Sequence, residues 1–309
     1  MRLMEIRRTE RTPPEPEGWV PFWHGYFQMA KVRSQIKLQA DRKTHTRPKD
    51  GSGREVTLDE SRLEQQVFLN IVADIGDEEI SMFELGAGRG DWCLALAGVV
   101  DHGLIECRAR RVRCLAVEGE PTHYQWTKEH FEAQGVAAQA VHGAVYSTNG
   151  TCRFKIVDDP SDNYGQSVSG DGQIDVPTYT VDALAERHGF DRIHIFHVDV
   201  QGAEVHALVG AKRTLLSGSP DYFIIGTHSK ELNEQIRFLL SPLYAVLIDY
   251  PHRAGIVDTP FGKAYLPADG MIVLKRRKRF RALARLAFRI RYRRFTKGNE
   301  FGHSGGVRS

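Results

Sequence analysis

The spacing of apolar positions divides the chain at about residue 58. Upstream of this point, residues 22–41 have helical spacing, and a polar, glycine-containing loop follows them. Over residues 58–75, apolar side chains recur every four positions, which predicts an amphipathic helix that Asp59 is suited to cap. The recurring residues are Leu63, Val67, Ile71 and Ile75.

Beyond this helix, short apolar runs alternate with amphipathic stretches as far as residue 274. The apolar runs predict strands at 80–85, 113–117, 138–145, 151–157, 173–179, 193–200, 222–225, 243–248 and 271–274. The stretches between them predict helices at 92–99, 122–134, 181–188, 203–216 and 230–240. Asn149-Gly150 predicts a hairpin turn between the third and fourth strands. Strands that alternate with helices favour an α/β fold with a mainly parallel, doubly wound sheet.

The strongest local signal for a ligand is the run FELGAGRGD, where the first strand ends and a helix begins. Its three glycines, Gly86, Gly88 and Gly90, allow a tight turn and let a ligand lie against the backbone. A dinucleotide site needs G-x-G-x-x-G, and the third glycine would then fall at Asp91. The observed spacing, with Glu84 two residues before the first glycine, is typical of S-adenosylmethionine sites instead.

Two acids at the ends of later strands extend this predicted cofactor site. Glu118 ends the second strand, where a carboxylate can accept hydrogen bonds from both ribose hydroxyls. Asp199 lies at another strand-to-helix junction, and ligands of open α/β sheets bind at the carboxyl ends of the strands. Asp199 is also suited to cap the following helix. Ala144, at the end of the third strand, completes the residues assigned to the cofactor.

From about residue 82 to 274, the chain resembles the FkbM-type class I methyltransferases. Four segments match in order, namely FELGAGRG, VEGEPTHY, YTVDAL and HVDVQGAEVHALVGAKRTL. The resemblance implies a Rossmann-like class I fold, with a mostly parallel seven-stranded sheet, helices on both faces and an antiparallel last strand. It implies S-adenosylmethionine as the cofactor and O-methylation of a hydroxyl on a sugar, glycolipid or secondary metabolite.

The chain also departs from the family pattern near the expected active site. His197 stands where the family usually has Lys, Gln201 replaces the first Glu of the motif, and Gly119 replaces a common Pro. An alcohol is a weak nucleophile and needs a base, for which His197 and His228 are equally good candidates. With Asp199, they form the predicted catalytic set.

Metal and oxidoreductase chemistry are less favoured by the sequence. Asp199 and His228 are suitable ligands for a divalent metal, but two residues do not make a metal site, so we expect none. The missing third glycine argues against the interpretation as a nicotinamide oxidoreductase. A methyltransferase acting on nucleic-acid bases is disfavoured because the loop after residue 198 lacks the Asn/Asp-Pro-Pro-aromatic pattern.

Charge separates the C-terminal segment from the rest of the chain. The net charge of +3 is the sum of about +12 for residues 275–309 and about −9 for residues 1–274. Residues 275–297 carry arginine at every fourth position, from Arg277 to Arg293, with apolar residues opposite, which predicts a basic amphipathic helix. The apolar residues are Leu283, Leu286, Ala287 and Ile290, with Phe280 beside them.

The tail suggests where the protein acts. An anionic membrane surface is the favoured partner of 275–297, ahead of docking on the acidic body and of nucleic acid. We therefore expect three parts: an N-terminal extension with one helix (1–57), the cofactor-binding domain (58–274) and the tail (275–309). Residues 1–17 contain no apolar leader, so we expect a cytoplasmic protein, peripheral at the inner face of the membrane. A non-catalytic protein that binds a partner through its tail is the alternative.

Overall fold

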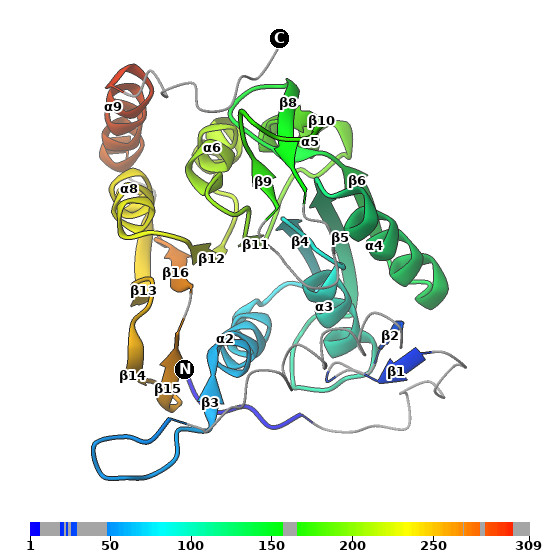
Figure 1. Ribbon diagram of the computed structural model, residues 1–309, viewed down its shortest axis with the longest axis vertical. Helices are drawn as coiled ribbons and strands as arrows, with labels where there is room; N and C mark the ends of the chain where they lie inside the picture. Colours follow the sequence, from blue (N-terminus) through cyan, green and yellow to red (C-terminus); the bar gives the residue numbers. More distant parts are fainter. Residues whose placement is uncertain are drawn as a thin grey trace.

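The computed structural model describes residues 1–6, 19–21, 23, 26–29, 48–156, 166–267, 269–278 and 282–298. A seven-stranded sheet at its centre has the order β13-β16-β12-β11-β4-β5-β6 (Figure 1). Its strands are β4 (Glu79–Leu85), β5 (Arg111–Glu118), β6 (Ala138–His142), β11 (Ile195–Val198), β12 (Tyr222–Thr227), β13 (Tyr244–Tyr250) and β16 (Gly270–Arg276). The five strands from β12 to β6 pair in parallel, whereas β16 is antiparallel to both of its neighbours. The predicted α/β fold, with its antiparallel last strand, is confirmed.

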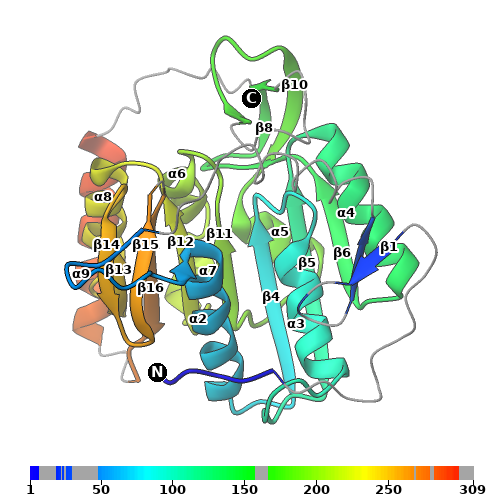
Figure 2. The ribbon, with the colours of Figure 1, turned by 60° about the horizontal axis from the view of Figure 1, so that its bottom comes forward.

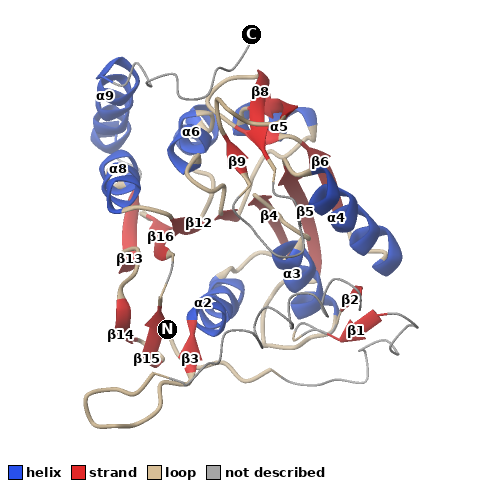
Figure 3. Cartoon of the chain, viewed as in Figure 1, coloured by secondary structure: helices blue, strands red, loops and turns tan. Residues whose placement is uncertain are grey.

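Helices cover both faces of this sheet (Figure 3). They are α2 (Glu60–Asp74), α3 (Asp91–Asp101), α4 (Pro121–Gln134), α5 (Val181–Arg187), α6 (Glu204–Val209), α7 (Lys212–Ser217), α8 (Lys230–Leu240) and α9 (Ala282–Gly298). Side chains of β4 alternate between the two layers, because successive residues of a strand point to opposite faces. Ile80 and Met82 join the core under α2 and α3, and Phe83 and Leu85 join the core under α5 to α9.

Smaller sheets flank the central one. A four-stranded sheet, β7 (Ala144–Val145), β10 (Ile174–Tyr179), β8 (Gly150–Lys155) and β9 (Ser167–Val168), stands beyond the carboxyl ends of the central strands (Figure 2). A three-stranded sheet consists of β14 (Gly255–Thr259), β15 (Gly262–Leu266) and β3 (Leu58–Asp59), and β1 (Trp19–Pro21) pairs with β2 (Phe27–Met29). The four-stranded sheet covers the edge where the glycine turn lies.

The predicted hairpin at Asn149-Gly150 is wrong. The expected strand 138–145 breaks at Gly143 (φ +152°), where a Cβ would lie 2.7 Å from the carbonyl oxygen of Pro177. β10 lies between β7 and β8, pairing in parallel with β7 and antiparallel with β8. The side chain of Asn149 accepts a hydrogen bond from the backbone N–H of Thr180 instead, at 2.8 Å. A distant strand therefore takes the place that the turn pattern assigned to a neighbouring one.

The single helix expected over 203–216 is two helices, α6 and α7. At Gly210, between them, a Cβ would lie 2.3 Å from the carbonyl oxygen of Tyr146. The carboxylate of Asp182 accepts from the backbone N–H groups of Arg213 and Thr214, at 2.8 and 2.9 Å, and so supports a new helix start. A tertiary contact and a cap from α5 override the continuous helical pattern.

The helix expected over 22–41 is contradicted where the structure describes it, because Phe27–Met29 is the strand β2. Residues 30–41 lie outside the described residues. The helix expected after Leu58 is confirmed as α2, and Asp59 caps it by accepting from the backbone N–H of Arg62 at 2.9 Å.

The basic tail begins inside the last strand. Lys275 and Arg276 belong to β16 and pair with acids of the body, Lys275 with Asp74 at 2.8 Å and Arg276 with Asp221 at 2.6 Å. The change in charge therefore precedes the end of the sheet by two residues. Of the helices in the described ranges, none is long and apolar enough to cross a membrane.

Candidate functional site

The three glycines of the turn after β4 have backbone conformations that residues with a side chain rarely adopt. Gly86, Gly88 and Gly90 have φ angles of +76°, +56° and +75°. A Cβ on Gly86 would lie 1.9 Å from the backbone oxygen of Asp199, and the N–H of Gly86 donates to the carbonyl of Val117 at 3.0 Å. The turn is thus fitted tightly between the ends of β5 and β11.

Glu84 supports this turn from below. Its two carboxylate oxygens accept from the backbone N–H groups of Trp92 and Cys93, at 3.0 and 2.8 Å, in the first turn of α3. Burial raises the pKa of Glu84 to about 7, although these N–H groups favour the ionised form. The side chain does not line the cavity described below, so Glu84 positions the start of α3 and the turn before it.

Glu118 lies at the end of β5, beside the turn. One of its oxygens accepts from the N–H of Gly88 at 2.7 Å, and the other from the N–H of Glu120 at 2.7 Å. Burial is the main cause that raises the pKa of Glu118 to about 7. A carboxylate fixed in this way has further lone pairs for hydroxyl donors.

A cavity that is open to solvent connects these features. The glycine turn and Glu118 bound one part, and Asp199, Val200, Gln201 and Ala203 bound another. The rest of its wall is formed by Val117, Gly119, His123, Gly143, Ala144, Val145, Phe154, Gln166 and Val168. Of the predicted site residues, Gly86, Gly88, Glu118, Ala144 and Asp199 therefore share one cavity. Gly90 lies outside this lining, against Phe131 of α4.

The four-stranded sheet contributes wall residues that the sequence did not indicate. Phe154 and Val168 come from β8 and β9, and Gln166 precedes β9. A Cβ on Gly119 would lie only 2.7 Å from the ring of Phe154. Gly119, which replaces the family's usual Pro, was the local signal for this packing, but nothing in the sequence named Phe154 as its partner.

His197 faces away from the cavity, toward α2. Its Nε2 lies 2.8 Å from Oε1 of Glu64, and its ring stacks on Trp92 with centroids 5.1 Å apart. Burial lowers the pKa of His197, but the hydrogen bond to Glu64 outweighs it, so the pKa is raised. His197 is absent from the cavity wall and is not placed to contact an acceptor there.

His228 and Asp199 do come together. Nε2 of His228 lies 3.2 Å from Oδ1 of Asp199, and Nδ1 lies 2.9 Å from Oε1 of Glu204, which is fully buried. Burial lowers the pKa of His228, but the two carboxylates outweigh it and raise the pKa to about 10. Burial raises and His228 lowers the pKa of Asp199, and the net effect is a lowered pKa. Asp199, the acid of this pair that faces the cavity, is thus held in its ionised form.

Gln201 adds a neutral partner at this corner. Its amide donates to Oδ1 of Asp199 at 3.0 Å, and its backbone has a φ of +50°, a conformation that costs energy for a residue other than glycine. The usual Glu at this position would place a second carboxylate beside Asp199. Glu204 lies in HVDVQGAEV, the segment that matches the family pattern. That match was the sequence signal that Glu204 belongs to this site.

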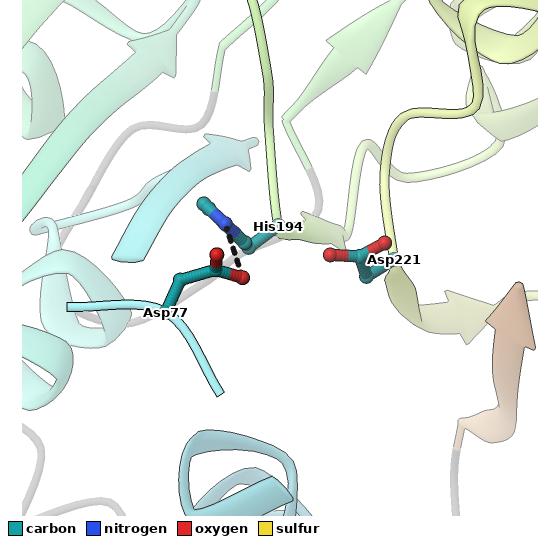
Figure 4. Close-up of side chains that lie close together, drawn as sticks. All are labelled: Asp77, His194 and Asp221. Atoms are coloured by element: carbon teal, nitrogen blue, oxygen red, sulfur yellow. Dashed lines mark ion pairs between the residues drawn. The ribbon is translucent and has the colours of Figure 1, made fainter. Parts of the chain in front are cut away.

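A second group of ionisable residues lies at the opposite, amino end of the strands. Asp77, His194 and Asp221 precede β4, β11 and β12 (Figure 4). Arg192 lies 3.5 Å from Asp77 and 2.7 Å from Asp221. This group is an ion-pair network that joins strand ends, remote from the cavity.

The fold and the glycine turn define a doubly wound α/β protein with a ligand site at the carboxyl ends of its parallel strands. Residues 84–247, just over half of the chain, match the methyltransferase FkbM domain. The chain therefore belongs to the FkbM methyltransferase family, as its sequence motifs predict.

Similar solved structures include two methyltransferases of bacteria. Precorrin-6Y C5,15-methyltransferase from Geobacter metallireducens is 11% identical, with a TM-score of 0.41 over 70% of this chain and 88% of that one. An rRNA methylase from Streptococcus thermophilus is 10% identical, with a TM-score of 0.39 over 69% and 95%. The METTL16 MTase domain is also 10% identical, with a TM-score of 0.39 over 84% and 87%. No curated protein matches the sequence.

Proposed function

We propose that this protein is an S-adenosylmethionine-dependent O-methyltransferase whose acceptor is a hydroxyl of a sugar, glycolipid or secondary metabolite. The observation that supports this most is the single cavity whose wall includes the glycine turn, Glu118 and Asp199. This arrangement supports a cofactor site next to an ionised group able to take the acceptor's proton.

The residues present fit the cofactor. Gly86 and Gly88 offer backbone without side chains, and Glu118 is a nearly buried carboxylate that still lines the cavity. S-adenosylmethionine supplies, when bound, a sulfonium-activated methyl group, so the protein's main task is to position the acceptor oxygen. Asp199, which faces the cavity, would accept the proton that the acceptor hydroxyl loses on methylation.

Calorimetric titration with S-adenosylmethionine tests the cofactor assignment, with NAD as the comparison ligand. We expect S-adenosylmethionine alone to bind, Gly88→Val to abolish binding and Glu118→Ala to weaken it. Circular dichroism checks that both variants remain folded. Unchanged affinity in folded forms of both variants would contradict the site.

The acceptor class is tested by incubating the protein with methyl-labelled S-adenosylmethionine and fractionated cell extract. We expect mass spectrometry to find label in small molecules or glycolipids that are one methyl group heavier. The Asp199→Asn variant should form the same product at least about 100-fold more slowly, the usual scale of a lost general base. Label confined to nucleic acid would contradict the proposal.

We also propose that α9 places the enzyme on an anionic membrane surface. The helix packs against the body through Phe288, which is fully buried, and Tyr292, which donates to the carbonyl of Val209 at 2.9 Å. Leu283, Leu286 and Ile290 are 74%, 53% and 46% exposed, and their spacing places them on one face.

Charge on α9 suits such a surface. Arg289, Arg293 and Arg294 are exposed on the same helix, near the outward apolar residues. Apolar side chains flanked by arginine are typical of helices that lie in a lipid interface, where each cation contributes about 1 kcal/mol.

Sedimentation with vesicles tests this surface. Vesicles rich in phosphatidylserine should carry the protein down, whereas phosphatidylcholine vesicles should not. The triple variant with Leu283→Ser, Leu286→Ser and Ile290→Ser should no longer sediment with the vesicles, and its thermal unfolding temperature should not change. Equal sedimentation of the triple variant and the parent chain would refute the proposal.

A further inference from the structure

Four ionisable side chains meet at the carboxyl ends of β11 and β12, beside the start of β16. They are Asp199, Glu204, His228 and Asp269. His228 is at the centre: its Nδ1 faces Glu204 at 2.9 Å, and its Nε2 faces Asp199 at 3.2 Å and Asp269 at 3.8 Å. The cluster is continuous with the proposed active site, because Asp199 also lines the cavity.

The two nitrogens of His228 have different surroundings. A histidine that binds a metal usually donates its other ring N–H to a carboxylate, which fixes the tautomer and aims the free nitrogen at the ion. Glu204 takes this role at Nδ1. In the described structure, Nε2 of His228 is buried and has no hydrogen-bond partner, although two carboxylates lie within 4 Å.

Glu204 provides a second sign that the cluster can accommodate a further positive charge. Its side chain is 0% exposed, and its Oε2 has no hydrogen-bond partner among the described residues. Leaving a buried polar atom without a partner costs free energy. The ion pairs of Asp199, Glu204 and Asp269 in the described ranges are all with His228, so one imidazole faces three carboxylates.

The group at the opposite end of the sheet shows what a compensated cluster looks like. In this group, as in that of Asp199, Glu204 and His228, the nitrogen and oxygen atoms able to bind a metal lie within 4.8 Å of one another. In the group at the opposite end, Arg192 pairs with both Asp77 and Asp221, and Arg276 lies 2.6 Å from Asp221. Nε2 of His194 also lacks a hydrogen-bond partner, so the two clusters differ in their charge. In the described ranges, no lysine or arginine forms an ion pair with Asp199, Glu204 or Asp269.

We propose that His228, Asp199 and Asp269 bind one divalent cation, which displaces the proton of Nε2 into solvent, with Glu204 orienting the imidazole. One nitrogen and two carboxylate oxygens suit a transition-metal ion such as Mn²⁺. Coordination positions that the protein leaves open on the ion would face the cavity, because Asp199 also lines it. This inference rests on the proposed O-methylation in one respect: the acceptor would be a molecule with two neighbouring oxygens, such as a vicinal diol, whose hydroxyl the ion makes more acidic.

Manganese binding to the purified full-length chain, first stripped with EDTA, tests the site without any acceptor. Electron paramagnetic resonance of free Mn²⁺ and calorimetry should show one ion per chain. Asp269→Asn should weaken binding by at least about tenfold, the usual effect of a lost metal-site partner. His228→Ala should abolish it, with circular dichroism to check the fold.

Asp77→Asn, in the compensated cluster, is the matched control and should bind Mn²⁺ like the parent chain. Equal affinity of the parent chain and Asp269→Asn, or no binding below millimolar Mn²⁺, would overturn the metal site. Titration of the same samples with S-adenosylmethionine separates the two proposals. Cofactor binding without manganese binding would refute the metal site alone, and manganese binding without cofactor binding would refute the proposed function alone.

Discussion

At the scale of single residues, Gly86 shows how closely the turn is packed. Gly86→Ala would place a Cβ 1.9 Å from a backbone oxygen, at a φ of +76°. We expect it to lower the free energy of unfolding by at least about 2 kcal/mol, measured by urea denaturation, because neither the backbone contact nor the φ can adapt cheaply. Gly51→Ala, with no atom within 4 Å of the new Cβ, is the control and should change stability by less than about 0.5 kcal/mol.

We expect Glu118 to make cofactor binding depend on pH. Its pKa is raised from 4.5 to about 7, and in the proposed site the ionised form is the one that could accept hydrogen bonds from both ribose hydroxyls. Affinity for S-adenosylmethionine should therefore fall about tenfold between pH 8 and pH 6, as the carboxylate is protonated. The contribution of this group to folding has the opposite sign: stability is greatest below pH 4.5 and decreases as pH rises toward 7.

Calorimetry across this pH range on the parent chain and on Glu118→Gln measures the effect. Glu84, whose pKa is also raised to about 7, titrates in both proteins, so only the difference between the two profiles belongs to Glu118. Parallel profiles would show that Glu118 does not contact the cofactor in its ionised form.

At the scale of elements, α9 has two faces with different tasks. Phe288 is fully buried among residues of the body. Phe288→Ala should therefore lower the free energy of unfolding, measured by urea denaturation, by about 3 kcal/mol. Leu283→Ala, at a position 74% exposed, should have no effect on stability. If both substitutions were neutral, the helix would not be docked in solution.

Single elements also show what a sequence pattern can predict. The strand before the glycine turn and the helices α2, α3 and α4 were predicted to within a few residues, since their periodicity and end signals are local. The hairpin at Asn149-Gly150 and the continuous helix over 203–216 were not, because β10 and the carbonyl of Tyr146 come from distant segments.

At the scale of the whole molecule, the central sheet and the four-stranded sheet touch at Gly119 and Phe154. The backbone of Gly119 does not need a positive φ, so Gly119→Ala acts only through the ring that its Cβ would meet at 2.7 Å. We expect it to cost about 1–3 kcal/mol and to weaken cofactor binding.

A double-mutant cycle with Phe154→Ala measures this coupling. The double variant should be more stable than the two single effects predict, by at least about 0.5 kcal/mol, because removing the ring makes room for the methyl group. Strict additivity would mean that the two sheets do not meet at this point in solution.

The sequence by itself determined the alternation of strands and helices over most of residues 58–274, the α/β class, the glycine turn, the acid that ends β5 and the acid that follows β11. These depend on local periodicity and on backbone conformations that only glycine favours. Tertiary structure decided the rest. It turned His197 toward Glu64 rather than the cavity, set His228 between Glu204 and Asp199, and brought Asp269 to the same cluster. It also chose which face of α9 is buried. The physical reason is that a side chain's charge and hydrogen bonding are settled by partners far away in sequence, which no local spacing reveals.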